Sequence, residues 1–338
     1  MPTPRPNTFL IGSMKSGTTY LSELLKMHPD VFVSSPREPC HFVDPAVLRT
    51  VWPQMWQRGY WRSVEQYLGL FAGAGDARII AEGSTAYSQA PLFAGVPERI
   101  LEFSPEAKFI YIMRDPVERT LSHYWHRVRW WGERRQPLAA IRNNQVYQSA
   151  SHYAHQLRSY LQHVPRQRIY VLTFEELIAD PLKNVQALYA WLGVEPAFAP
   201  VLDYAPTNPT PATVEQVRGF GALNHIRRSA LYSRFEPWLP ASLRKLARRL
   251  AVRDVRPADA CVEAVEHYLR PIQTRQTAEL SQLLGRAFAE WATLFATASA
   301  TRAGRLPGSR LPGRERVTPD KPQGSDGKRC VAHHEVCR

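Results

Sequence analysis

The chain has 338 residues, 44% of them hydrophobic, and its 43 Lys and Arg outnumber its 30 Asp and Glu to give a net charge of +13. This apolar content supports a buried core and excludes a chain that is disordered throughout. No apolar run approaches the roughly 18 residues of a membrane-spanning helix, and the charged, proline-rich start is unlike a secretory signal. Four scattered cysteines are typical of a reducing compartment, so we predict a cytoplasmic protein without a transmembrane segment.

The first predicted element is a short buried strand over residues 7–12, followed by a helix that ends at His28 and Pro29. Apolar segments at 78–81, 108–113 and 168–173 predict further strands, and helical patterns over 117–131 and 182–192 follow the last two. Strands that alternate with helices favour an α/β fold, a three-layer arrangement with a central parallel sheet flanked by helices. Ligands of such sheets bind at the carboxyl ends of the strands.

Beyond residue 205 the strand signal fades, and helices are predicted over 239–250, 262–269 and 277–295 at the edge of the same domain. The last 38 residues carry nine Lys or Arg against four Asp or Glu and contain no aromatic residue. We therefore predict one domain over residues 1–300 and a basic, disordered tail over 301–338. Two cysteines and two histidines near the end of this tail lie too close together to surround an ion, so no metal site is predicted.

The segment GSMKSGTT lies where the first strand turns into a helix. Backbone amides at a helix N-terminus bind phosphate-like anions, a lysine adds charge, hydroxyls add donors, and glycine permits close approach. The pattern predicts a phosphate or sulfate site formed by Lys15, Ser16, Gly17, Thr18 and Thr19. It is not a Walker A loop, because the lysine precedes the second glycine instead of following it.

A second anion site is predicted at the end of the strand over 108–113, which delivers Arg114 to the same edge of the sheet. Ser122 follows on the next helix, and a guanidinium and a hydroxyl in this arrangement can hold a second phosphate. The alternative is that Arg114 pairs with Asp115 or Glu118 at the start of that helix.

Three separated segments, TFLIGSMKSGTTYLSELLKMHPDV, IYIMRDPVERTLSHY and VLTFEELIADP, together resemble the sulfotransferases that use 3'-phosphoadenosine 5'-phosphosulfate (PAPS). The resemblance is greatest to the bacterial and carbohydrate-acting branch and covers roughly residues 7–295. It implies a P-loop-like fold, PAPS as co-substrate and no required metal. It also implies that residues 15–19 bind the 5'-phosphosulfate, that Lys15 stabilises the leaving oxygen, and that Arg114 and Ser122 hold the 3'-phosphate.

The acceptor needs a base, and PREPCHF resembles the segment of heparan sulfate N- and 3-O-sulfotransferases in which a glutamate has this role. Glu38 is the matching residue. His41 stands where the family has a phenylalanine, so it either assists Glu38 or packs in the core. AEGSTAYS resembles a second family segment and makes Glu82 the alternative base, although Gly83 replaces the family's lysine.

Tryptophans and arginines near the end of the helix over 117–131 suit an anionic sugar, although aromatic stripes on helices are also typical of cores. The predicted acceptor is a hydroxyl or amine of a carbohydrate, glycolipid or similar molecule, and the sequence leaves the oligomeric state open. Two alternatives are a P-loop kinase that uses Mg-ATP and a non-enzymatic protein that binds polyanions or nucleic acid. A misplaced lysine disfavours the first, and the second lacks a nucleic-acid-reading motif, so no specific nucleic-acid partner is predicted.

Overall fold

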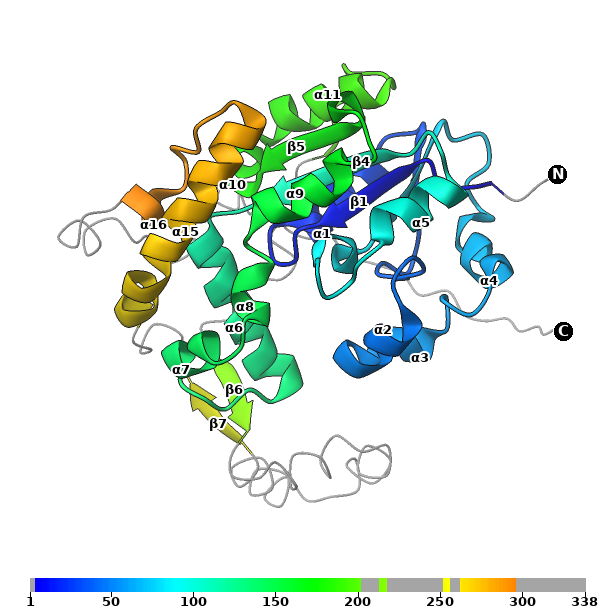
Figure 1. Cartoon of the computed structure of the whole chain (residues 1–338). Helices are drawn as coiled ribbons and strands as arrows, with labels where there is room; N and C mark the ends of the chain where they lie inside the picture. The colour runs from blue at the N-terminus through cyan, green and yellow to red at the C-terminus, as the bar shows by residue number, and fades with distance from the viewer. Residues whose placement is uncertain (1–3, 202–212, 218–251, 256–261, 296–338) are drawn as a thin grey trace, which may run out of the picture. The chain divides into compact units, whose positions relative to one another are not determined.

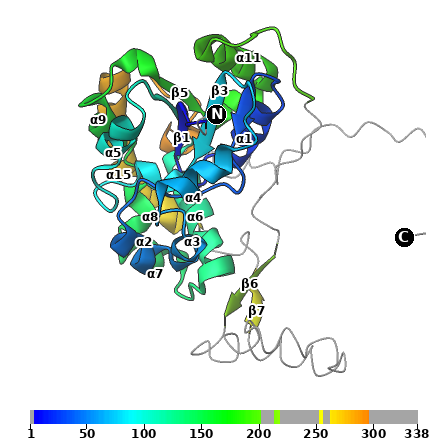
Figure 2. The ribbon, with the colours of Figure 1, turned by 90° about the vertical axis from the view of Figure 1, so that its right-hand side faces the viewer.

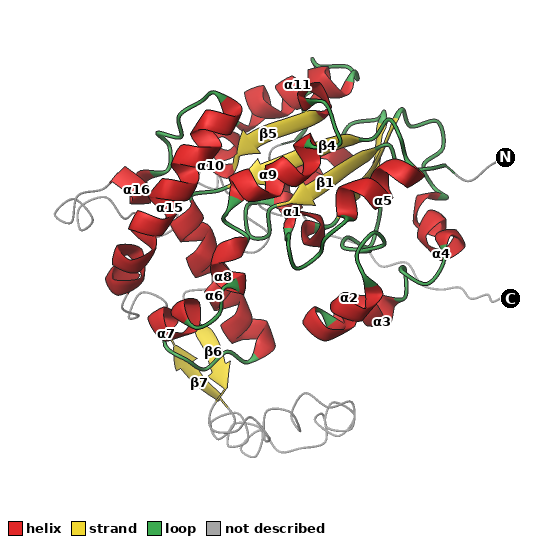
Figure 3. Cartoon of the chain, in the orientation of Figure 1, coloured by secondary structure: helices red, strands yellow, loops and turns green. Residues whose placement is uncertain are grey.

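A sheet of five parallel strands forms the centre of the fold in a computed structural model of the chain, which describes residues 4–201, 213–217, 252–255 and 262–295 (Figure 1). Their order is β2-β3-β1-β4-β5, and Figure 3 shows them between helices. This confirms the predicted three-layer α/β fold. The strands are β1 (Thr8–Gly12), β2 (Val31–Val33), β3 (Ile79–Gly83), β4 (Lys108–Met113) and β5 (Ile169–Thr173).

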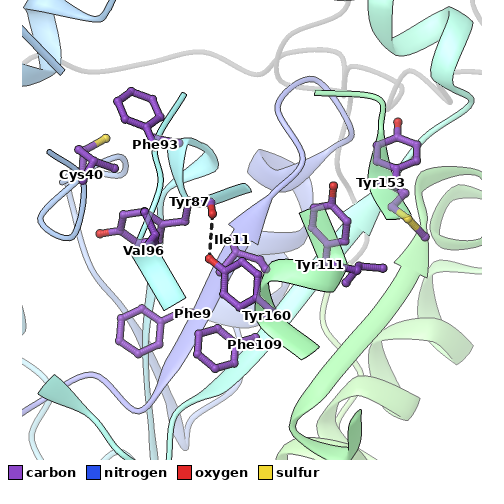
Figure 4. Close-up of a cluster of buried hydrophobic side chains, with 14 of the residues drawn as sticks. Phe9, Ile11, Cys40, Tyr87, Phe93, Val96, Phe109, Tyr111, Tyr153 and Tyr160 are labelled. Carbon is purple, nitrogen blue, oxygen red and sulfur yellow. Dashed lines mark hydrogen bonds between the residues drawn. The ribbon is translucent and has the colours of Figure 1, made fainter. Parts of the chain in front are cut away.

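Both faces of the sheet are buried. In β4, Phe109 and Tyr111 belong to one apolar cluster, whereas Ile110 between them belongs to another on the opposite face. Figure 4 shows part of the first cluster, where the hydroxyl of Tyr160 donates to the backbone carbonyl of Tyr87 at 2.8 Å. Because both faces are covered, the strands have continuous apolar sequences, which is why most of them could be predicted.

Helices form a layer on each face, and Figure 2 shows the sheet between them. Helices α1 and α11 pack their leucines on one side, and α5, α6 and α9 contribute to the cluster on the other. The helices before β6 are α1 (Thr18–Lys26), α2 (Pro45–Val51), α3 (Pro53–Arg58), α4 (Val64–Leu68), α5 (Val96–Phe103), α6 (Pro116–Trp131), α7 (Pro137–Arg142), α8 (Val146–Ser149), α9 (Tyr153–Leu161), α10 (Phe174–Ala179) and α11 (Pro181–Leu192).

The strand order places a topological switch point between β1 and β4. The chain leaves β1 through α1 toward β2 on one side of the sheet, and it leaves β4 toward β5 on the other. Loops that diverge from neighbouring parallel strands leave a crevice at their carboxyl ends, where ligands of open α/β sheets bind. The two predicted anion sites follow β1 and β4, so they lie on either side of this crevice.

The structure differs from the sequence predictions in three places. The strand β2 was not predicted, because its three residues are too few for a local signal. No strand was expected beyond residue 205. The structure describes two, β6 (Val214–Val217) and β7 (Val252–Val255), which pair antiparallel. Strand β6 packs against α6. This pairing joins segments far apart in the chain, which local periodicity does not reveal.

The third difference concerns the helices expected over 262–269 and 277–295. The structure has one helix, α15 (Val262–Leu284), which continues through Pro271, and then a separate short helix, α16 (Ala292–Phe295). A proline removes one helical hydrogen bond, but α15 packs along α7 and α9, and this tertiary packing stabilises the helix on both sides of it. The predicted helix over 239–250 and the predicted tail over 301–338 lie outside the described residues. No helix in the described part of the chain combines the length and apolar character needed to cross a bilayer.

Candidate active site at the carboxyl edge of the sheet

The loop after β1 has the backbone of an anion site. Helix α1 begins at Thr18, and Gly17 before it has φ of 89°, a left-handed conformation that favours glycine. A Cβ on Gly17 would lie 2.5 Å from the ring of Phe174 at the start of α10. Glycine is therefore required by both backbone and packing, and the first amides of α1 have no partners within the helix.

The hydroxyls of this loop differ in their surroundings. The hydroxyl of Ser16 is buried and lies 2.5 Å from that of Ser13, so it stabilises the loop internally. Thr18 and Thr19 are half-buried at the first turn of α1. The hydroxyl of Thr19 accepts a hydrogen bond of 2.5 Å from Arg37, a residue of the segment that contains Glu38.

Lys15 has φ of 70° and is half-buried in this loop. Burial, followed by the neighbouring charges of Arg114, Arg129 and Arg119 in that order, lowers the pKa of its ammonium to about 8. Among the described residues no carboxylate lies within ion-pair distance of Lys15. A half-buried ammonium among several guanidinium groups favours the binding of an anion.

Arg114 follows β4, as predicted, and its backbone is held by Tyr153. Its carbonyl accepts a 2.7 Å hydrogen bond from the hydroxyl of Tyr153. Its guanidinium lies 5.2 Å from the ring centre of Phe174 and 3.2 Å from a carboxylate oxygen of Glu118. The pairing with Glu118 that the sequence left open is thus present. Both groups are partly exposed, so this ion pair is weak and a phosphate can replace it.

Ser122 lies one turn beyond Glu118 on α6, which places it on the side of the helix that faces Arg114. His126 and Arg129 follow on the same side at helical spacing. Burial lowers the pKa of His126 to about 4, with smaller contributions from the charges of Lys15 and Arg129. His126 was not predicted as a site residue, although its spacing of four from Ser122 was a usable signal.

Arg119 is a second residue that the sequence did not reveal. It is fully buried on α6, where it donates to the hydroxyl of Ser151 at 2.5 Å, to the carbonyl of Tyr147 and, at 3.4 Å, to the carbonyl of Met14 in the loop after β1. In the described part of the chain no carboxylate forms an ion pair with it. Its charge therefore adds to the positive potential behind the loop.

Glu38 lies at the same edge of the sheet, after β2. Its two carboxylate oxygens accept hydrogen bonds from the backbone amide of Thr85 at 2.8 Å and from the Thr85 hydroxyl at 3.0 Å. Burial raises the pKa of Glu38 to about 7, although both bonds from Thr85 and the charges of Arg37 and Arg58 act in the opposite direction. Its φ of 60° is a left-handed conformation that is rare in residues other than glycine and is concentrated at functional sites.

Glu82 lies near the end of β3, as predicted, but it is fully buried. Its carboxylate accepts hydrogen bonds of 2.5 Å from the Tyr67 hydroxyl and 2.6 Å from the Ser84 hydroxyl, and burial raises its pKa to about 7. The Ser84 hydroxyl also accepts a 3.1 Å bond from the backbone amide of Cys40. Glu82 therefore supports the backbone two residues after Glu38.

His41 packs against the same group of residues. Its ring stacks on Tyr67 at 4.2 Å with an angle of 8°, and its Nδ1 lies 2.6 Å from the carbonyl of Tyr60. Burial lowers the pKa of His41. These contacts agree with the packing alternative, and its assistance to Glu38 stays a prediction.

The tryptophans of α6 differ in exposure. Trp125 is buried and belongs to the core. Trp130 is 49% exposed beneath the guanidinium of Arg129, and Trp131 lies 6.4 Å from Trp52 at the end of α2. Trp130 and Trp131 thus lie at the C-terminal end of α6, directly after Arg129.

Known proteins resemble this chain in sequence and in structure. A curated relative, the membrane-associated sulfotransferase kil1 of Dictyostelium discoideum, is 33% identical over 132 residues, which are 39% of this chain and 25% of that protein. The heparan sulfate glucosamine 3-O-sulfotransferase 5 of Homo sapiens is 28% identical over 204 residues, which are 56% of this chain and 54% of that protein. The chain thus spans a quarter of the first relative and about half of the second.

Among solved structures, a sulfotransferase from Alicyclobacillus acidocaldarius superposes with a TM-score of 0.60 at 23% identity. The match covers 85% of this chain and 99% of that one, and it shows that the two share a fold. The model of the Sulfotransferase family matches residues 6–199, which are more than half of the chain and include the loop after β1, Glu38, Glu82, Arg114 and Ser122. The chain therefore belongs to the Sulfotransferase family.

Proposed function

We propose that the chain binds PAPS and transfers its sulfuryl group to a hydroxyl or amine of an acceptor by in-line displacement, without a metal. One observation carries the proposal: Lys15, which has no ion-pair partner among the described residues and lies near the charges of Arg114 and Arg119, is at the same sheet edge as Glu38. The hydrogen bond between Arg37 and Thr19 ties their two segments together. Family membership supports the same reaction.

The chain's own residues suit a nucleotide with two anionic ends. The amides at the start of α1, with Lys15, would bind the 5'-phosphosulfate. Arg114 and Ser122 would hold the 3'-phosphate across the switch point between β1 and β4. Bound PAPS supplies a sulfuryl group on a nucleotide that leaves with negative charge. A protonated Lys15 directed at the bridging oxygen would stabilise that charge.

Glu38 is the proposed base, and Glu82 is proposed to position it. A base must reach the acceptor, and Glu38 is only partly buried, whereas the carboxylate of Glu82 is enclosed by Tyr67 and Ser84. With a pKa of about 7, Glu38 is close to the value at which a general base works best near neutral pH.

A carbohydrate or glycolipid acceptor is the proposed partner. His126, Arg129, Trp130 and Trp131 extend from the nucleotide side along α6, and rings with guanidinium groups suit acidic sugars. The curated relative from Homo sapiens is named for a heparan sulfate acceptor. The cytoplasmic location and the two-part division at residue 300 stay predictions from the sequence.

Calorimetric titration with 3',5'-adenosine bisphosphate, the product nucleotide, and with ATP tests the nucleotide assignment without knowledge of the acceptor. We expect tight binding of the bisphosphate that does not depend on Mg, and weaker binding in Lys15→Ala and Arg114→Ala. Lys26→Ala, which changes an exposed lysine at the end of α1, is the matched control. Preference for Mg-ATP would favour a kinase, and no binding would exclude the proposed reaction. Transfer of labelled sulfate from PAPS to a panel of oligosaccharides and glycolipids then tests turnover.

A further inference from the structure

Residues 285–295, between the end of α15 and the end of α16, form a segment that we call the C-terminal strap (Figure 1). It is held at the end of β5 by polar contacts. Glu290 accepts a 3.1 Å hydrogen bond from the hydroxyl of Thr173, the last residue of β5. Arg286 pairs with Glu290 at 2.7 Å and with Glu176 of α10 at 2.9 Å. These contacts fix the first half of the strap beside α10.

The second half of the strap bonds to the turn that presents Arg114. The hydroxyl of Thr293 lies 2.6 and 2.8 Å from the two carboxylate oxygens of Asp115, and the Thr293 amide donates to one of them at 3.0 Å. Trp291, which is fully buried, donates its indole N–H to Glu175 at 3.3 Å. The other oxygen of Glu175 accepts a 2.9 Å bond from the Asp115 amide. The strap thus reaches Asp115 both directly and through Glu175.

The hydrogen bonds from the strap help to stabilise the negative charge of the buried Asp115 carboxylate. Asp115 is buried and also accepts hydrogen bonds from the amides of Val117 and Glu118, as the N-cap of α6. Both oxygens of Asp115 are bonded to neutral donors, and Arg114 pairs instead with the partly exposed carboxylate of Glu118. The Asp115 carboxylate therefore has its hydrogen bonds from the strap and from the start of α6. It does not need to pair with the Arg114 guanidinium, which can bind an anion.

We propose that Thr293 and Trp291 of the C-terminal strap are positioning residues for the 3'-phosphate, because they hold Asp115 and the backbone of Arg114 in the conformation that presents the guanidinium. Neither residue touches the ligand in this proposal. It rests on the proposed function, in which Arg114 binds that phosphate.

The test compares two nucleotides that differ only in the 3'-phosphate. Full-length protein is titrated calorimetrically with 3',5'-adenosine bisphosphate and with adenosine 5'-monophosphate, and the ratio of the two affinities is the readout. In Thr293→Val, which keeps the shape and loses the hydroxyl, we expect bisphosphate affinity to fall about tenfold while monophosphate affinity changes less than about twofold. Thr293→Ser should restore the ratio.

The control is Thr277→Val, which removes a buried hydroxyl from α15 outside the strap and should leave the ratio unchanged. If Thr293→Val does not fold, Trp291→Phe keeps a buried aromatic ring, removes the indole N–H donor and should lower the ratio in the same direction. Equal weakening of both nucleotides, or no change in either, would overturn the proposal. Arg114→Ala separates the two hypotheses. If the affinity ratio is unchanged in Arg114→Ala, the 3'-phosphate assignment is refuted. If the ratio falls in Arg114→Ala but not in Thr293→Val, only the role of the strap is refuted.

Discussion

The carboxyl edge of the sheet carries two regions of opposite charge. Around the ends of β1 and β4, burial and then the charges of neighbouring arginines lower the pKa of Lys15 to about 8. Around the ends of β2 and β3, burial raises the pKa of Glu38 and of Glu82 to about 7. The two regions meet where Arg37 donates to Thr19.

The difference lies in how each region is built. The main groups of the cationic region come from two motifs that are each contiguous in the sequence, the loop after β1 with Lys15 and the turn after β4 with Arg114. The carboxyl region depends on partners from other segments, since Thr85 orients Glu38 and Tyr67 encloses Glu82. A phosphate site can thus be carried by a short motif, whereas a base of the right pKa requires a folded environment.

Glu38→Gln should have the largest effect and should separate the two regions. Loss of a general base typically lowers turnover by about 10²- to 10⁴-fold. Because the cationic region does not include Glu38, affinity for 3',5'-adenosine bisphosphate should change less than about twofold. Sulfate transfer and calorimetry on the same preparation measure both quantities. If Glu82→Gln proves more damaging than Glu38→Gln, the two roles are reversed.

Lys15→Ala should affect both binding and turnover. Removal of one group that stabilises transition-state charge costs about 10²- to 10³-fold in kcat, and the loss of an unpaired cation also weakens nucleotide binding. Steady-state kinetics with varied PAPS would show both changes, while Lys26→Ala should behave as the wild type. Unchanged nucleotide affinity in Lys15→Ala would contradict the assignment of the loop.

Gly17→Ala tests the backbone of the cationic region. The left-handed conformation alone costs about 1–2 kcal/mol for alanine, and the contact with Phe174 adds to it, so we expect lower stability and about tenfold weaker nucleotide binding. Gly193→Ala is a matched control, because Gly193 has φ of 86° and no atom within 4 Å of the added Cβ. It should lower thermal stability without affecting nucleotide affinity. Equal effects of both variants on binding would contradict a role for the contact with Phe174.

The pH dependence of kcat/KM should report the titration of one group from each region, and we expect these changes in rate to be the smallest of those predicted. Glu38 must lose its proton, so the rate should rise as the pH increases through about 7. Lys15 must keep its proton, so the rate should fall above about 8. A bell-shaped profile between these values is expected for the wild type. In Glu38→Gln the rise on the acidic side should disappear, and its persistence would assign that titration to another group.

Much of the fold was predictable because four of the five central strands are short apolar runs buried on both faces. The strand β2 and the pair β6 and β7 were missed, since each is stabilised by pairing with distant segments. In the site, Lys15 and Arg114 were found from contiguous motifs. Arg119 was not, because an arginine within a helix gives no signal of burial, and Thr293 was not, because it lies 178 residues from Asp115.

Residue types and their order along the chain suffice to predict the parallel sheet, the anion-binding loop and the family, because each depends on short-range periodicity or on contiguous residues. Three features required the folded structure: the enclosure of Glu82 by Tyr67 and Ser84, the burial of Arg119 and the contact of the strap with Asp115. Each depends on burial and on hydrogen bonds between distant segments. The sequence gives the identity of each side chain. Its protonation state and orientation depend on burial and on long-range contacts, which exist only in the packed chain.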